Sequence, residues 1–309
     1  MEETKSITAI KFCEFTGHSA SVYALEHGSS PDKIFSGSGD FFLAEWDLEK
    51  ILPEKFSIKT EATIYSICNI AELGILILGN SNGSLHIIDL KIKKEIKNIF
   101  AHTKGVFKID YNRKKNHFYS LGGDGYLNIW DVNNFELKIA IKISEQKLRS
   151  LSIHQNGERL AIACGDGTIR IFETDFYNEI SNTTAHLAGV TMVCFHPDGK
   201  RIVSGGKDAL LNIWIVNDTE IQLEKTIPAH HFSIYAGVFS PDQKFFATCS
   251  RDKTIKIWSA ASFDFLLRID RKDFKAHTHS VNALLWNENS NFLISAGDDK
   301  KVMVWKIGS

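Results

Sequence analysis

Five histidines in this chain are each followed, after the same interval of 28 residues, by a tryptophan. The pairs are His18/Trp46, His102/Trp130, His186/Trp214, His230/Trp258 and His277/Trp305. In two further blocks of equal length Ile88 and Phe172 take the place of the tryptophan, so the marker recurs at 46, 88, 130, 172, 214, 258 and 305. The chain therefore consists of seven repeats of 42 to 47 residues, from about Thr16 to Ile307. Such a period predicts the four-stranded blade of a β-propeller rather than a helical repeat.

The third repeat illustrates the predicted blade. Residues 106–111 alternate like a strand, and short apolar runs follow at 117–120, 126–130 and 137–143. Between the second and third runs lies Gly122-Gly-Asp-Gly125, whose residues tolerate the positive φ of a tight hairpin. The order of strands and turns is the same in every repeat. We therefore expect an all-β domain over residues 1–309, with no composition break for a linker.

Dipeptides at the ends of the repeats resemble the markers of the WD40 family. Gly17-His18 is followed by Trp46-Asp47, and Ala101-His102 by Trp130-Asp131, while three later repeats end in Trp214-Ile, Trp258-Ser and Trp305-Lys. The resemblance covers essentially the whole chain. It implies a seven-bladed WD40-type β-propeller of four antiparallel strands per blade, closed by the N-terminal strand at residues 7–15, which completes the last blade.

The resemblance also implies a buried network of His, Ser or Thr, Asp and Trp in each blade. Five repeats contain the set: His18, Ser36, Asp40 and Trp46; His102, Ser120, Asp124 and Trp130; His186, Ser204, Asp208 and Trp214; His230, Thr248, Asp252 and Trp258; His277, Ser295, Asp299 and Trp305. The equivalents are Thr60, Leu78, Asn82 and Ile88 in the second repeat, and Ser144, Ile162, Asp166 and Phe172 in the fourth. The losses occur together, as a hydrogen-bonded network predicts, because a buried polar group without its partner is costly.

Composition favours a cytoplasmic protein without a membrane or nucleic-acid role. The formal charge is −1 and the isoelectric point is near 6.9, which weighs against a surface built to neutralise phosphates. The five cysteines are odd in number and lack CxxC spacing, which favours a reducing compartment. The sequence also lacks an apolar run of eighteen residues.

The chemistry of the sequence favours a protein that is not an enzyme. His, Ser and Asp suggest a hydrolase, but a nucleophilic triad occurs once, whereas this set recurs in step with a bulky Trp. The remaining histidines, among them His86, show no metal-binding spacing such as HExxH, and no Walker A sequence is present. We therefore expect no catalytic residue, cofactor or metal.

A partner is expected at the mouth of the central channel. In the family the innermost strand of each blade borders the channel, and the second residue of that strand should point to its mouth. These positions are rich in aromatic residues, and basic residues precede the hairpin Asp in blades five and six. The predicted site is Tyr23, Tyr65, Phe107, Lys147, Arg149, Lys207, Tyr235, Arg251 and Asn282.

This residue mix is typical of interaction hot spots, although aromatic residues also suit strands and could simply fill the channel entrance. We expect a scaffold that binds a protein or peptide, with an acidic or phosphorylated segment matching the basic arc. It should act as a monomeric propeller within a larger assembly. Two alternatives stay open: an RNA- or DNA-associated module that uses the same surface, and a propeller that binds a small ligand or catalyses a reaction.

Overall fold

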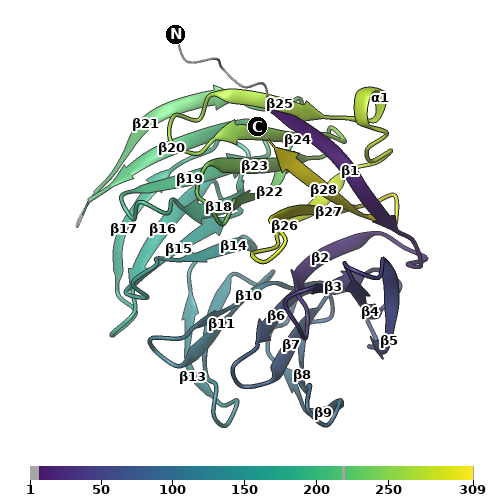
Figure 1. The fold of residues 1–309 in the computed structure, drawn as a ribbon. Helices are drawn as coiled ribbons and strands as arrows, with labels where there is room; N and C mark the ends of the chain where they lie inside the picture. Colours follow the sequence, from purple (N-terminus) through teal and green to yellow (C-terminus); the bar gives the residue numbers. More distant parts are fainter. Residues whose placement is uncertain (1–6, 218–219, 309) are drawn as a thin grey trace. The chain divides into compact units, whose positions relative to one another are not determined.

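The computed structural model describes residues 7–217 and 220–308, in which all regular structure except one short helix is β-strand. The strands form seven antiparallel sheets of four strands each (Figure 1). This confirms the predicted fold class, a seven-bladed β-propeller with four strands to a blade. The contacts divide the chain into two compact units, residues 1–59 with 236–309, and residues 60–235.

Residues 60–235 contain four complete blades. The strands of the second and third blades are β6 (Ile64–Ile70), β7 (Ile75–Asn80), β8 (Ser84–Asp89), β9 (Lys94–Phe100), β10 (Val106–Asn112), β11 (His117–Gly122), β12 (Tyr126–Asp131) and β13 (Leu137–Lys142). Those of the fourth and fifth are β14 (Leu148–Ile153), β15 (Arg159–Cys164), β16 (Thr168–Glu173), β17 (Glu179–Thr184), β18 (Val190–Phe195), β19 (Arg201–Gly206), β20 (Leu210–Val216) and β21 (Ile221–Pro228). Within each blade every strand pairs with the next strand along the chain, and in this unit β10 also contacts β6 and β14.

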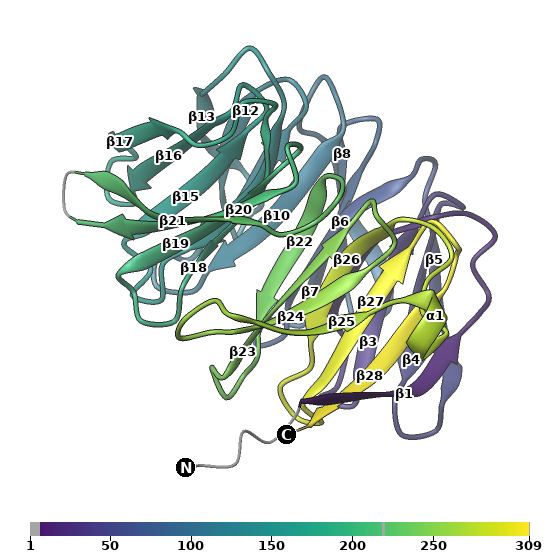
Figure 2. The ribbon, with the colours of Figure 1, turned by 90° about the horizontal axis from the view of Figure 1, so that it is seen from above.

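The other unit contains the first and last blades. Their strands are β1 (Thr8–Phe15), β2 (Val22–His27), β3 (Lys33–Ser38), β4 (Phe42–Asp47), β5 (Leu52–Lys59), β26 (Val281–Trp286), β27 (Phe292–Gly297) and β28 (Val302–Gly308). The sixth blade begins at the boundary between the units and consists of β22 (Ile234–Phe239), β23 (Phe245–Ser250), β24 (Ile255–Ser259) and β25 (Phe265–Ile269). The helix α1 (Arg271–Phe274) follows it and lies beside β1 (Figure 2).

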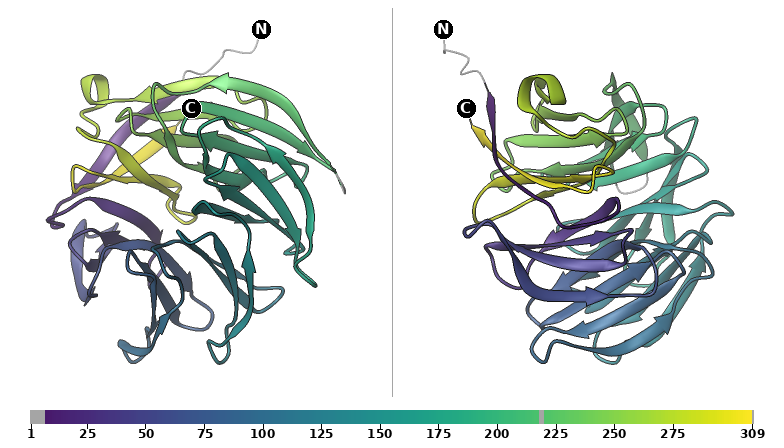
Figure 3. Two further views of the ribbon diagram at one scale, coloured as in Figure 1. Left: turned by 180° about the vertical axis from the view of Figure 1, so that it is seen from behind. Right: turned by 90° about the vertical axis from the view of Figure 1, so that its right-hand side faces the viewer.

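The N-terminal strand completes the last blade, as the sequence predicts. Strand β1 pairs antiparallel with β28, from Thr8 opposite Gly308 to Phe15 opposite Val302, and the strand order in this sheet is β1-β28-β27-β26. Both views in Figure 3 show the purple N-terminal strand beside the yellow C-terminal strand. Glu14 reinforces the pairing, because its carboxylate binds the Lys301 ammonium at 2.7 Å and that of Lys11 at 3.0 Å. The edge of β28 is thereby covered.

Candidate functional site

β-bulges occur at the second residue of the first strand, the position that the sequence analysis expects at the channel mouth. In six blades the pairing between the first two strands shifts by one residue at the start of the first strand. The extra residues are Tyr23, Tyr65, Phe107, Arg149, Thr191 and Asn282. A bulge leaves its extra residue outside the ladder and turns the side chain to a new direction.

Three of these bulge residues, from consecutive blades, contact one another. The rings of Tyr65 and Phe107 are stacked, with centroids 5.3 Å apart and planes 13° from parallel. The guanidinium carbon of Arg149 lies 4.4 Å from the centroid of the Phe107 ring. This is the geometry of a cation–π contact, which fixes the plane of the guanidinium. We call Tyr65, Phe107 and Arg149 the aromatic stack.

Arg149 is half-buried and lacks an acidic partner. Its Nε atom is buried without a hydrogen-bond acceptor, and no carboxylate in the described part of the chain lies within ion-pair distance of the guanidinium. Burial lowers the pKa of Arg149, while the nearby hydroxyls of Tyr235 and Tyr65 act in the opposite direction. An arginine remains charged despite such a shift, so the site contains a partly desolvated cation.

Two lysines add to this positive charge. Burial lowers the pKa of Lys147, and the charges of Arg149 and Lys207 lower it further. Neither lysine has a carboxylate within ion-pair distance among residues 7–217 and 220–308. Other lysines of this unit do have such a partner, for example Lys114 with Glu158 at 2.6 Å. We call Lys147, Arg149 and Lys207 the cation cluster, and its members repel one another in the absence of an anion.

Backbone contacts tie the loops that hold the cation cluster. The Gly165 N–H donates to the Lys147 carbonyl at 2.8 Å, and the Lys207 N–H donates to the Gly189 carbonyl at 3.1 Å. Gly189 has a φ of +100°, and a Cβ at this position would lie only 2.8 Å from the Gly165 oxygen. Glycine is therefore required for the close approach of the two loops. Lys147 and Lys207 are consequently linked through the loops of Gly165 and Gly189, each of which is bonded to one of the two lysines.

The remaining predicted residues lie elsewhere or are engaged. Tyr235 is half-buried and near enough to Arg149 to affect its pKa. Tyr23, Arg251 and Asn282 belong to the other unit. The Asn282 amide donates to the Val22 carbonyl at 3.1 Å and to Asp298 at 2.8 Å, so it has an internal structural role. Lys147, Arg149, Lys207, Tyr65, Phe107 and Tyr235 are the predicted site residues that the structure brings together.

The family network is fully bonded in blades one, three, five and seven. In the first blade the Trp46 indole donates to Ser36 Oγ at 2.7 Å, Ser36 Oγ lies 2.8 Å from His18 Nε2, and His18 Nδ1 lies 2.9 Å from Asp40. The equivalent bonds join His102, Ser120, Asp124 and Trp130, then His186, Ser204, Asp208 and Trp214, and then His277, Ser295, Asp299 and Trp305. In the sixth blade Trp258 donates to Thr248 Oγ1 at 2.9 Å.

The hydrogen-bonding groups of the four residues determine which group donates and which accepts in each network. Trp can only donate, so the Ser hydroxyl accepts from it and donates to His Nε2, which leaves the Nδ1 hydrogen for the Asp carboxylate. In the third blade burial tends to raise the pKa of Asp124, but hydrogen bonds from His102 and from two backbone N–H groups outweigh burial and hold the pKa at about 2. Both ring nitrogens of His102 are hydrogen-bonded within the network, so this histidine is not available as a catalytic base.

A comparison with protein families now identifies the repeat. The model of the WD40 family, described as "WD domain, G-beta repeat", matches residues 8–47, 93–131, 140–173, 178–214, 221–259 and 270–306. These matches cover more than half of the chain. The chain belongs to the WD40 family. The match omits residues 48–92, which contain the first three strands of the second blade, where the family network is absent.

Several curated proteins are similar to this chain. The 66 kDa stress protein of Physarum polycephalum is 21% identical over 306 residues, which is 85% of this chain and 49% of that protein. The serine-threonine kinase receptor-associated protein of Gallus gallus is 24% identical over 79% of this chain and 68% of its own length. The WD repeat-containing protein 1 of Gallus gallus is 23% identical over 79% of this chain and 47% of its own length. The chain thus spans about half the length of two of these relatives.

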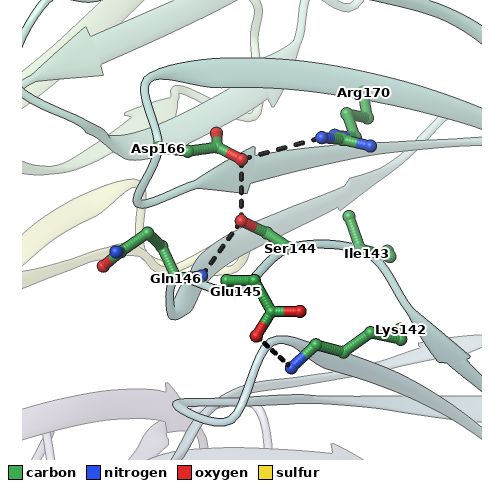
Figure 4. Close-up of a pocket in the computed structure, with 7 residues that line it drawn as sticks. All are labelled: Lys142, Ile143, Ser144, Glu145, Gln146, Asp166 and Arg170. Atoms are coloured by element: carbon green, nitrogen blue, oxygen red, sulfur yellow. Dashed lines mark hydrogen bonds and ion pairs between the residues drawn. The ribbon is translucent and has the colours of Figure 1, made fainter.

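The fourth WD40 blade has a small hollow where the network is missing. Ser144 stands at the histidine position and donates to Asp166 at 2.7 Å, while Arg170 lies 3.6 Å from the same carboxylate and Lys142 lies 3.3 Å from Glu145 (Figure 4). The hollow has a volume of about 440 Å³. Its charged groups are paired with one another, so an ionic ligand would have to displace those pairs. The cation cluster offers unpaired charge and is the stronger candidate site.

The second WD40 blade has a different polar centre, which the sequence analysis missed. His86 is buried, with Nε2 3.2 Å from Glu61 and Nδ1 3.1 Å from Glu95. The Asn80 amide lies 3.2 Å from His86 Nε2. His86 lies two residues before Ile88, and a histidine there in the blade that lacks the family network was the available indication. His86 joins the loop before β6 to β8 and β9.

Within residues 7–217 and 220–308, no group of three or more His, Cys, Asp or Glu side chains is arranged to hold a metal ion. That part of the chain also has no helix long and apolar enough to cross a membrane.

Proposed function

We propose that this WD40 protein is a non-enzymatic interaction scaffold that binds an acidic segment of a partner protein at the cation cluster. One observation carries the proposal: Lys147, Arg149 and Lys207 lie together without a carboxylate partner among the described residues. Cations that are close and partly desolvated repel one another, and an anion relieves that repulsion. A carboxylate or a phosphoryl group supplies the required oxygen acceptors.

The aromatic stack makes Arg149 a suitable anchor. Its contact with Phe107 holds the guanidinium plane before a partner arrives, so less side-chain entropy is lost on binding. Arginine and aromatic residues are enriched among the side chains that dominate binding energy at interfaces. The arrangement therefore supports an interface hot spot rather than a general positive surface.

A nucleic-acid function is the less favoured proposal. Stacking of bases requires an accessible aromatic face, but the Phe107 ring is already in contact with both Tyr65 and Arg149. The net charge of −1 also weighs against it. A strong loss of binding to single-stranded RNA between low and moderate salt would revive this alternative.

The names of relatives agree with an interaction role without defining it. One relative is named a receptor-associated protein, which describes association in that protein. We further propose a cytoplasmic location, since all five cysteines are free thiols, and a single-domain monomer that acts within a larger assembly. The proposed partner is a protein, and the proposal includes no cofactor.

Affinity capture from extract of the organism that makes the protein tests the proposed function. We compare wild type with the charge-reversal variant K147E/K207E and with R149Q, and identify retained proteins by mass spectrometry. The matched control is K94E/K200E, which reverses two exposed lysines elsewhere in the same unit. A partner with an acidic segment should be retained by wild type and the control and lost from K147E/K207E. Equal retention by all variants would overturn the proposal.

A further inference from the structure

Two exposed apolar residues lie on loops that are hydrogen-bonded to Lys207 of the cation cluster. Leu187 is 98% exposed and Phe232 is 56% exposed, and they lie in the loops before β18 and β22. An isolated apolar residue on a surface is ordinary. Here, however, two of them occupy the equivalent loop of neighbouring blades, next to unpaired charge.

The other blades do not have an apolar residue of this size in that loop. The two residues that follow the histidine position are Ser19-Ala, Glu61-Ala, Thr103-Lys, Glu145-Gln and Thr278-His in the remaining five blades. In blades five and six they are Leu187-Ala and His231-Phe232. Polar residues are the rule at this position, so the fold itself does not require a leucine or a phenylalanine there.

The loops of Leu187 and Phe232 enclose Lys207. The Lys207 N–H donates to the carbonyl of Gly189, two residues after Leu187, at 3.1 Å. The hydroxyl of Ser233, directly after Phe232, donates to the Lys207 carbonyl at 3.5 Å. Lys207 therefore has an apolar side chain on the loop to each side, and the Leu187 loop also contacts Gly165, next to Lys147.

We infer that the segment bound at the cation cluster carries a large apolar side chain beside its acidic group, and that this side chain packs against Leu187 and Phe232. This inference rests on the proposed function. The acidic group neutralises the cation cluster, and the apolar contact removes from water the exposed apolar surface of Leu187 and Phe232. The charge sets the rate and orientation of binding, while the apolar contact gives selectivity among acidic segments.

Selection from a display library of random peptides tests the inference with a defined probe. Wild type should enrich peptides with an acidic residue near Leu, Ile, Met or Phe. L187S/F232S should still enrich acidic residues but should lose the apolar preference, and it should bind the strongest wild-type peptide at least about tenfold more weakly. Both positions are exposed, so these substitutions leave the core intact.

The matched control is L223S/F265S, which removes two side chains that are each 54% exposed on the outer strands β21 and β25. It should bind like wild type. If wild type enriches acidic peptides without an apolar preference, or if L187S/F232S keeps that preference, the inference is wrong while the proposed function stands. If wild type enriches no acidic peptide, both are wrong.

Discussion

The guanidinium of Arg149 lies against the ring of Phe107, 4.4 Å from its centroid, and both residues are the extra residues of β-bulges in consecutive blades. The bulges take both side chains out of the ladder, and the contact with the Phe107 ring orients the charge of Arg149. The plane of the Arg149 guanidinium is therefore fixed, and this charge lies near Lys147 and Lys207.

If this contact orients the charge, Arg149→Lys should weaken binding of the best acidic display peptide although the charge is kept. We expect a loss of roughly twofold to thirtyfold, which corresponds to a cation–π contact of about 0.5–2 kcal/mol. Phe107→Leu should have a similar effect, and the double variant should lose little more than either single one. Fluorescence anisotropy gives the three affinities; additive losses would show that the two residues act independently.

The lowered pKa of Lys147 predicts how binding depends on pH. A bound anion favours the protonated amine, so the affinity for an acidic peptide should fall as the pH rises through the pKa of free-state Lys147. The unfolded chain binds more protons between that pKa and the ordinary value of 10.5, so the contribution of Lys147 to stability rises with pH in this window. Arg149→Gln should raise the pKa of Lys147, which heteronuclear NMR of the lysine side chain measures.

Removing the central hydroxyl of a family network should destabilise its blade. Ser36→Ala leaves the Trp46 indole N–H and the His18 Nε2 atom buried without their partner. We expect the free energy of unfolding in urea to fall by about 1–3 kcal/mol. Ser181→Ala, on the outer strand β17, serves as control and should change it by less than about 0.5 kcal/mol. Equal effects would mean that the network contributes nothing beyond packing.

The low pKa of Asp124 predicts part of the loss of folding stability at acidic pH. A carboxyl group with a depressed folded-state pKa contributes stability that is present above its unfolded value, near 3.8, and is lost as the pH falls toward about 2. Asp124→Asn should therefore lower stability at pH 6 and flatten the pH dependence between pH 4 and pH 2. Chemical denaturation at a series of pH values measures both. An unchanged slope in that interval would contradict the role assigned to the His102 contact.

The repeat pattern was sufficient to predict the blades, because each blade repeats the same turns and the same alternation of apolar residues. The closing pair of β1 and β28 was expected from the resemblance to the WD40 family. The polar centre at His86 was not predicted, since its partners Glu61, Asn80 and Glu95 come from different elements and form no sequence motif.

The site was predicted only in part. Strand alternation picked out Tyr65, Phe107 and Arg149, but it did not predict the bulges that direct these side chains or the stacking between them. The absence of a carboxylate near Lys147 and Lys207 in the described part of the chain depends on loops brought together by folding. Charge counts cannot show this, because the whole chain is close to neutral.

The affinity of the strongest display peptide for wild type, K147E/K207E and K94E/K200E tests the central claim most directly. If the cation cluster binds an acidic segment, isothermal titration at low salt should show at least about a tenfold weaker Kd for K147E/K207E and an unchanged Kd for K94E/K200E, with the difference shrinking as salt is added. Equal affinities for the three proteins, or an equal loss in both variants, would contradict it.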